Sequence, residues 1–212
     1  VDSVLPADGG DLRRRTLGDL EGAGNLSRWF CRQMLSLFGE LGLVVLESGH
    51  LPYKELGRPL WVRVLEDPLA LTEGVRQAGE NLSRRGFRPA LFKEKRRTPF
   101  FLIEDGRRLP VFFERGSFRV GDRRYTPLEL RSRLDEKPEE FSPGVNLRPI
   151  LQDSLLPTAA YVAGPTELAY FLQVIPGYHW AEIPPPALVL RAAVTLVEPS
   201  VRKLLQRRRI EA

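Results

Sequence analysis

LRPILQDSLLPTAAYVAGPTELAY, residues 147–170, decides the fold class, because it predicts a helix, a strand and a second helix in direct succession. Ser142-Pro143 is typical of a helix cap followed by a first helical proline, and Pro157 ends that helix. TAAYVAG has the short, small and apolar character of a central strand. Gly164-Pro165 then opens the next helix, with Glu167 in its first turn. A strand that runs into a helix start is where α/β proteins bind anions, at the carboxyl edge of the sheet. The apolar side of the first helix would carry Val145, Leu147, Ile150, Leu151 and Leu155.

The flanking segments predict further parallel α/β units. Residues 18–42 have helical apolar spacing with Gly42 as the stop, and LVVLE (43–47) follows as a continuous apolar run, typical of a strand covered on both faces. Residues 67–86 predict a helix with Asp67 as its N-cap, Pro68 at its first position and Gly86 as its terminator. Downstream, PALVLRAAVTLVEP (186–199) predicts a strand and SVRKLLQRRR (200–209) a basic helix.

Residues 96–126 have a different sequence pattern, in which short apolar runs are separated by turn dipeptides. Asp105-Gly106, Arg115-Gly116 and Gly121-Asp122 predict antiparallel hairpins. An antiparallel patch in an α/β chain commonly is an insertion or edge flap, so we interpret 96–126 as a small β insertion, followed by a short helix over 127–136. We expect residues 1–212 to form one α/β domain or domain fragment, with flexible ends at 1–15 and 206–212.

The composition restricts the class of protein. The chain has 212 residues, 42% of them hydrophobic, which suffices for one ordinary core. The single Cys31 has no disulfide partner and no spaced Cys or His neighbours, which favours a reducing, cytoplasmic compartment and no metal site. No apolar stretch approaches 18 residues, so we expect no membrane span.

The formal net charge of +5 leaves two explanations open, an anionic partner or arginine-rich genome composition. Basic clusters at 13–15, 93–97 and 202–209 lack the interleaved aromatic residues of a single-strand binding platform, so a nucleic-acid-binding module is the least favoured function.

FSPGVNLRPILQDSLLPTAAYVAGPTELAYFLQ (141–173), preceded by TLGD (16–19) and LFGELGLVVLE (37–47) and followed by TLVEP (195–199), resembles the bacillithiol biosynthesis cysteine-adding enzymes, the BshC family of cysteine ligases. The resemblance implies a Rossmann-like parallel sheet, of which this chain carries the second half, akin to the core of class I aminoacyl-tRNA synthetases. It implies addition of L-cysteine to glucosaminyl-malate through an amide, with ATP or another nucleotide activating the cysteine carboxylate. The resemblance implies a possible homodimer, although the coiled coil through which the family dimerises has no counterpart in this sequence.

Candidate substrate-binding residues follow the strand edge. Arg148 could clamp a carboxylate of malate or cysteine, or instead form an ion pair with Asp153 or Glu167. Gln152 and Asp153 could orient sugar hydroxyls or the incoming amine, or instead make hydrogen bonds within the core. Arg191 could bind a ligand phosphate or carboxylate, or instead pair with Glu198. The remaining candidates lie around the strand end and are Thr158, Tyr161, Gly164, Pro165 and Glu167.

Two departures from the family's sequence pattern favour a non-catalytic protein as the alternative to an active ligase. Ile175 stands where the family has a Lys-like residue, and Ala193 stands where it has Ser. Their loss could remove ligand contacts, so a truncated, non-catalytic relative that binds thiol metabolites or a nucleotide remains a second hypothesis, and catalytic residues are not assigned.

Overall fold

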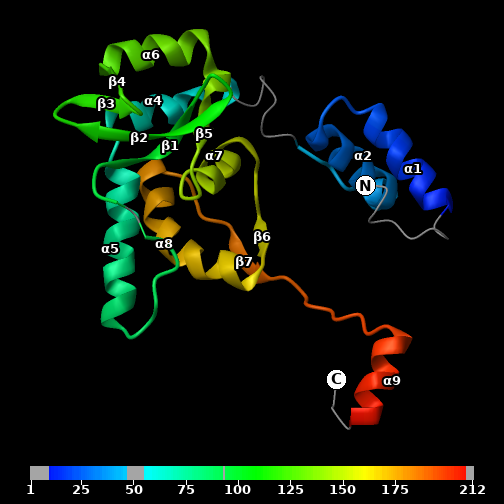
Figure 1. Cartoon of the computed structure of the whole chain (residues 1–212). Coiled ribbons are helices and arrows are strands. Elements are labelled where there is room, and N and C mark those ends of the chain that lie inside the picture. Colours follow the sequence, from blue (N-terminus) through cyan, green and yellow to red (C-terminus); the bar gives the residue numbers. More distant parts are fainter. Residues whose placement is uncertain (1–9, 47–54, 93, 209–212) are drawn as a thin grey trace.

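The computed structural model describes residues 10–46, 55–92 and 94–208. Its helices are α1 (Gly10–Glu21), α2 (Leu26–Phe38), α4 (Arg58–Glu66), α5 (Ala70–Arg84), α6 (Pro127–Glu136), α7 (Arg148–Leu155), α8 (Pro165–Ala181) and α9 (Pro199–Arg208), with 3-10 turns η1 (Gly39–Leu41) and η2 (Pro138–Glu140). Its strands are β1 (Arg97–Glu104), β2 (Arg107–Glu114), β3 (Ser117–Val120), β4 (Arg123–Tyr125), β5 (Phe141–Pro143), β6 (Ala160–Ala163) and β7 (Ala187–Leu190). Figure 1 shows a body from α4 to β7, with the α1–α2 pair to one side and α9 beyond an extended segment.

The antiparallel sheet is the largest element of the body. Its order is β4-β3-β2-β1-β5, and the predicted hairpins are confirmed. Asp105-Gly106 and Arg115-Gly116 supply consecutive residues with positive φ, between 49° and 76°, as tight hairpin turns require. The sheet has two faces of opposite character because side chains alternate along each strand.

The inner face of this sheet packs on α4 and α6 around a cluster of aromatic rings. Trp61 of α4 meets Phe100 and Phe141 edge-on, with centroid distances of 5.8 and 5.7 Å. Leu130 and Leu134 of α6 are fully buried against the same cluster. Helix α6 covers the predicted residues 127–136. The main core of the body therefore lies under the hairpins.

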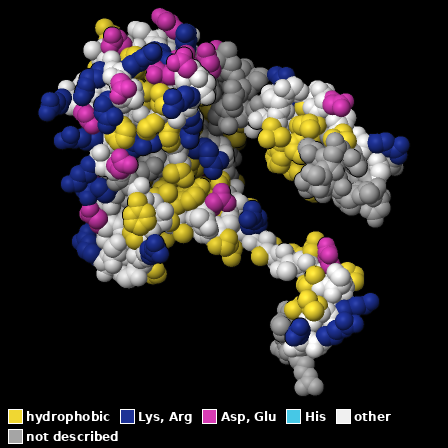
Figure 2. All heavy atoms as spheres, viewed as in Figure 1, with side chains coloured by type: hydrophobic (Ala, Val, Ile, Leu, Met, Phe, Trp, Pro, Cys, Tyr) yellow, Lys and Arg dark blue, Asp and Glu magenta, His cyan; other side chains and the backbone are white. Residues whose placement is uncertain are grey.

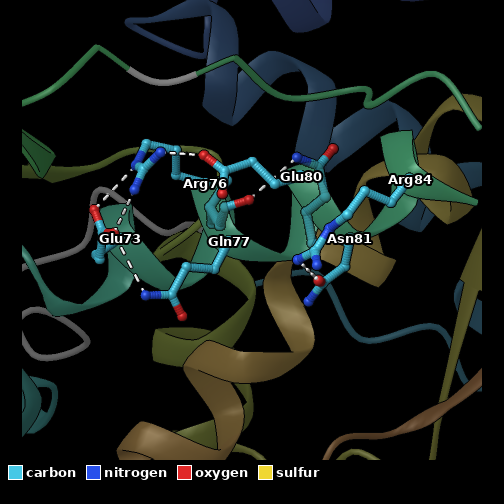
Figure 3. A network of polar contacts seen from close by, with 8 residues as sticks. Glu73, Arg76, Gln77, Glu80, Asn81 and Arg84 are labelled. Atoms are coloured by element: carbon cyan, nitrogen blue, oxygen red, sulfur yellow. Dashed lines mark hydrogen bonds and ion pairs between the residues drawn. The ribbon is translucent and has the colours of Figure 1, made fainter.

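Helices α5 and α8 pack side by side, and Gly79 permits their close approach. A Cβ at Gly79 would lie 2.9 Å from Gln173 Nε2, so no larger residue fits without displacing that amide. The exposed side of α5 carries ion pairs that Arg76 makes with Glu73 and Glu80, one helical turn away in each direction (Figure 3). These pairs support a helix that its glycines would otherwise weaken.

The parallel sheet is only partly confirmed. Strands β6 and β7 pair in parallel from Ala160↔Ala187 to Ala163↔Leu190, but they form a two-stranded sheet of their own. Residues 191–198, predicted to continue the last strand, form no strand. The mixed α/β class stands, while most of the pairing is antiparallel.

Two predicted helix starts are wrong. Ser142-Pro143 belongs to β5, which pairs with β1, and α7 begins only at Arg148 with Pro149 in its first turn. Gly144 makes this turn possible, because a Cβ there would lie 2.6 Å from the Pro99 carbonyl oxygen. Asp67, the predicted N-cap, is instead the C-cap of α4, a helix that was not predicted. Helix α5 starts after Leu69. Gly86, at φ 84°, follows the end of α5 as predicted.

The helix predicted over 18–42 is divided in two. Gly24 has φ 74°, and Asn25 caps α2 by accepting a hydrogen bond from the Arg28 backbone at 2.8 Å. Residues 43–46 pair with no described strand and are largely exposed, so the predicted buried strand is wrong there, and Glu47 lies outside the described residues. Residues 10–15 and 206–208, expected to be flexible, are helical in α1 and α9.

No residue of α2 is buried, and the helix exposes several large apolar side chains, visible as yellow patches in Figure 2. They are Leu26, Phe30, Leu35, Leu37 and Phe38.

Candidate functional site

The candidate site lies where β6 ends and α8 begins. Pro165 takes a first-turn position of α8, and the Glu167 carboxylate accepts a hydrogen bond from the Gly164 backbone N–H at 2.9 Å. This contact is the main reason that the pKa of Glu167 is lowered, with a further contribution from Tyr161. Glu167 is therefore an ionised cap of α8, as its spacing from Gly164-Pro165 predicted.

Tyr161 connects this cap to Arg148. The Tyr161 hydroxyl donates to Glu167 Oε1 at 2.9 Å. Burial and the hydrogen bond to Glu167 raise the pKa of Tyr161 to about 12, although Arg148 opposes the shift. Burial lowers the pKa of Arg148, but interactions with the Tyr161 and Tyr170 hydroxyls outweigh that effect and raise it. The Tyr161 oxygen thus interacts with both the guanidinium and the carboxylate.

Asp153 is held by two hydroxyl groups. Thr158 Oγ1 donates to Asp153 Oδ1 at 2.8 Å, and the Tyr178 hydroxyl donates to Oδ2 at 2.6 Å. Tyr178 is fully buried, and burial together with Asp153 raises its pKa. Gln152 reaches Asp153 only through a long contact of 3.4 Å. Asp153 therefore ties α7 to α8, and Gln152 is the less engaged of the two neighbours.

Arg191 approaches the same turn from β7. Its backbone N–H donates to the Ala163 carbonyl at 2.8 Å, which continues the parallel ladder by one step. A Cβ on Gly164 would lie 3.2 Å from Arg191 Nη2, so the guanidinium lies directly against the turn between β6 and α8. Gly164 is the residue that leaves it this space.

Neither arginine has a carboxylate partner within ion-pair distance in the part of the chain that the structure describes. The alternative pairings of Arg148 with Asp153 or Glu167, and of Arg191 with Glu198, are therefore absent among these residues. Both charges still lower the pKa of Glu167, which shows that they act on the same turn. Two cations that flank a helix N-terminus are suited to binding a carboxylate or a phosphate.

The structure brings six of the nine predicted site residues together at the turn before α8, namely Arg148, Tyr161, Gly164, Pro165, Glu167 and Arg191. Asp153 and Thr158 instead meet Tyr178 near the carboxyl end of α8, and Gln152 makes only its long contact with Asp153 among the described residues. Two residues that were not predicted take part in these contacts. They are Tyr170, whose hydroxyl acts on the Arg148 guanidinium, and Tyr178, which donates to Asp153. One sequence feature could have pointed to these two residues. A buried tyrosine hydroxyl needs a hydrogen-bond partner, and tyrosines stand at 161, 170 and 178, close to the predicted polar site residues.

The remaining grooves, histidines and acidic groups of the described chain do not belong to the candidate site. A groove of about 760 Å³ runs between α5 and the segment after it, and none of its lining residues belongs to the candidate site. Among residues 10–46, 55–92 and 94–208 no group of three or more His, Cys, Asp or Glu is arranged to hold a metal. His179 is exposed, and His50 lies outside the described residues. No described helix has both the length and the apolar character needed to cross a membrane.

Comparison with known proteins gives one consistent family. The family model described as "Bacillithiol biosynthesis BshC, N-terminal Rossmann-like domain" matches residues 11–192. A Salinibacter ruber protein named "Putative cysteine ligase BshC" is 44% identical over 180 residues, which are 84% of this chain and 33% of the relative. A Thermus thermophilus protein of the same name is 38% identical over 193 residues, 89% of this chain and 39% of that protein. The chain therefore spans between a third and two fifths of the length of these relatives.

Proposed function

The chain belongs to the BshC family, and from that membership we propose that it forms the substrate-binding part of a ligase that joins L-cysteine to glucosaminyl-malate. The single observation that carries the proposal is the pair Arg148 and Arg191 at the N-terminus of α8, both without a carboxylate partner among the described residues. A substrate that bears carboxylates would give these guanidinium groups a direct partner, which Glu167 at the same turn does not provide. The cytoplasm is the proposed compartment, since the lone Cys31 suits a reducing environment.

In the proposed reaction, the substrate amine attacks the carboxyl carbon of cysteine, a C–N bond forms and the amine loses one proton. The carboxyl carbon at the same time loses its leaving group, which is phosphate or AMP when ATP is the co-reactant. Arg148 and Arg191 contribute by holding a carboxylate or phosphate in a fixed position, and fixed hydrogen-bond donors lower the barrier because they need no reorganisation.

A second candidate function is binding of thiol metabolites or a nucleotide without catalysis. It is favoured by the engagement of both carboxylates of the site. Asp153 accepts from two hydroxyls, and Glu167 accepts from Tyr161 and from the Gly164 backbone. Neither carboxylate is thereby left free to act as a general base for the incoming amine.

Calorimetric titration of the chain with glucosaminyl-malate, alongside mass-spectrometric detection of the cysteinyl product with ATP present, tests the first function. We expect Arg148→Gln and Arg191→Gln each to weaken binding about 10- to 100-fold, because losing a charge-assisted hydrogen bond costs about 1.5–3 kcal/mol. Arg148→Lys keeps the charge but not the planar fork, so it should fall between wild type and Arg148→Gln.

Arg202→Gln, an exposed arginine of α9, is the matched control and should bind as the wild type does. Binding that is unchanged in both Arg148→Gln and Arg191→Gln would rule out this site. Binding that depends on both arginines but yields no product with any nucleotide would select the second function.

A further inference from the structure

The outer face of the antiparallel sheet carries alternating arginine and phenylalanine side chains. Along β1, Phe100 and Leu102 are buried under the helices, so Phe101 between them points to the opposite face. Arg97 lies on the same side, because its guanidinium is over the Phe101 and Phe112 rings. On β2 and β3, Phe112 pairs with Arg119 across the strands, and Phe112 also pairs with Arg97 of β1. We name these outward residues the arginine–phenylalanine face, which consists of Arg97, Phe101, Arg108, Phe112 and Arg119.

The guanidinium groups of this face lie over the rings. Arg108 Cζ is 3.6 Å from the Phe101 ring centroid, and Arg97 Cζ is 4.8 Å from the same centroid and 5.2 Å from that of Phe112. Arg108 is fixed further, since its Nε donates to Ser142 Oγ at 2.9 Å and its Nη2 to the Pro143 carbonyl at 2.8 Å. Cations held against rings are already ordered and lose little freedom when a ligand binds.

The positive charge of this face is only partly neutralised. Glu114 pairs with Arg119 at 3.3 Å and with Arg124 at 3.8 Å. Arg97 and Arg108 have no carboxylate within ion-pair distance among the described residues, although Glu94 is near enough to act on Arg97. Burial lowers the pKa of both groups, and the charge of Arg97 lowers the pKa of Arg108 further. Both remain charged at neutral pH, so two partly desolvated cations repel each other.

We propose that the arginine–phenylalanine face binds a nucleotide, with Arg97 and Arg108 as partners of its phosphates. The guanidinium fork matches phosphate oxygens, and the outward plane of a guanidinium can stack a base. Two unpaired cations suit one di- or triphosphate, whereas a nucleic-acid strand needs a longer row of phosphate contacts. Figure 2 shows basic side chains gathered over the part of the body that carries β2, β3 and β4.

The site differs from the one at the start of α8, yet the chain connects them. Arg108 holds β5, and β5 leads through a few residues to Arg148 and α7. The inference extends the proposed ligase function by giving its nucleotide a location. It is tested by equilibrium binding rather than turnover, so that the two proposals can fail separately.

Calorimetric titration with ATP, pyrophosphate and adenosine tests the proposal. We expect ATP to bind most tightly, and Arg97→Gln and Arg108→Gln each to weaken ATP binding by about tenfold or more. Arg124→Gln removes the same charge from the same sheet, but its guanidinium is paired with Glu114, so its effect should stay below about threefold. Circular dichroism and thermal unfolding identify variants that fail to fold.

Glu114→Gln gives a test that misfolding cannot imitate. It releases Arg119 and Arg124 from their carboxylate, so we expect ATP to bind about threefold or more tightly. Unchanged ATP binding in folded Arg97→Gln and Arg108→Gln, or no ATP binding at millimolar concentration, would overturn the proposal. Pyrophosphate that binds as tightly as ATP would also overturn the nucleotide assignment.

Two further outcomes would relocate the ligand. ATP binding that is lost in Arg148→Gln but kept in Arg97→Gln would move the nucleotide to the candidate site at α8. A single-stranded oligonucleotide that binds more than about tenfold tighter than ATP, with a steep salt dependence, would replace the nucleotide by a nucleic acid.

Discussion

At the scale of the residue, Gln173 shows how one buried side chain joins separate segments. Its Oε1 accepts from the backbone N–H groups of Ala90 and Leu91, each at 2.8 Å. Its Nε2 donates to the Leu91 carbonyl at 2.9 Å and to the Val75 carbonyl at 3.3 Å. The side chain is fully buried, and all of its hydrogen-bonding capacity is used. Gln173 therefore holds the segment after α5 against α8.

Gln173→Leu should lower the free energy of unfolding by about 2–4 kcal/mol, because buried backbone groups without a partner cost about 1–3 kcal/mol each. Urea denaturation measures the change. Gln77→Leu, on the exposed side of α5, is the control and should change it by less than about 0.5 kcal/mol. Equal effects of the two substitutions would show that the Gln173 hydrogen bonds contribute nothing special.

At the scale of the element, helix α6 shows how a local signal fixes a boundary. Thr126 Oγ1 accepts from the Glu129 backbone N–H at 3.2 Å, and the Glu129 carboxylate accepts from the Thr126 backbone N–H at 2.7 Å. The contact with Thr126 lowers the pKa of Glu129, so the carboxylate is ionised at neutral pH. Pro127 takes a first-turn position. The three residues lie within four consecutive positions, so local interactions fix the start of this helix, and its bounds match the predicted residues 127–136.

Thr126→Ala should destabilise the protein by about 1 kcal/mol, since it removes the side-chain oxygen that caps α6. The comparison is Ser132→Ala, in the exposed middle of the same helix, which should be neutral or slightly stabilising because alanine favours the helix. Thermal unfolding of both variants measures the change in stability. A Thr126→Ala protein as stable as the wild type would mean that packing alone holds the helix start.

At the scale of the whole molecule, the core of the body contains no described residue of the first two helices. The buried cluster starts at Leu60 and includes residues of the antiparallel sheet, α4, α6, α7 and α8. Helices α1 and α2 pack on each other, and Figure 1 shows them apart from the body. The chain thus combines an autonomous core with a helix pair whose apolar side chains remain exposed.

Removal of residues 1–54 should shift the thermal midpoint of the body by less than about 4 °C, corresponding to about 1 kcal/mol for a chain of this size. The reason is that residues 10–46, the part of this segment that the structure describes, contribute no residue to the core cluster. Differential scanning calorimetry measures the midpoint. A shortened chain that no longer unfolds cooperatively would show that α1 and α2 stabilise the body.

The sequence by itself determined the features that depend on neighbours along the chain. The hairpin turns at Asp105-Gly106 and Arg115-Gly116, the helix over 127–136 and the Gly164-Pro165 start of α8 each depend on residues close together along the chain, so they were predicted correctly. The resemblance carried by residues 141–173 likewise pointed to the family.

Only the tertiary structure decided what depends on distant partners. Ser142-Pro143 reads as a helix cap, but pairing with β1 makes it a strand, and an apolar run such as 43–46 becomes a strand only where another strand accepts its hydrogen bonds. The same reason applies to the polar residues. Sequence spacing located Arg148 and Arg191, but whether each meets a carboxylate depends on how β6, β7 and α7 come together in space.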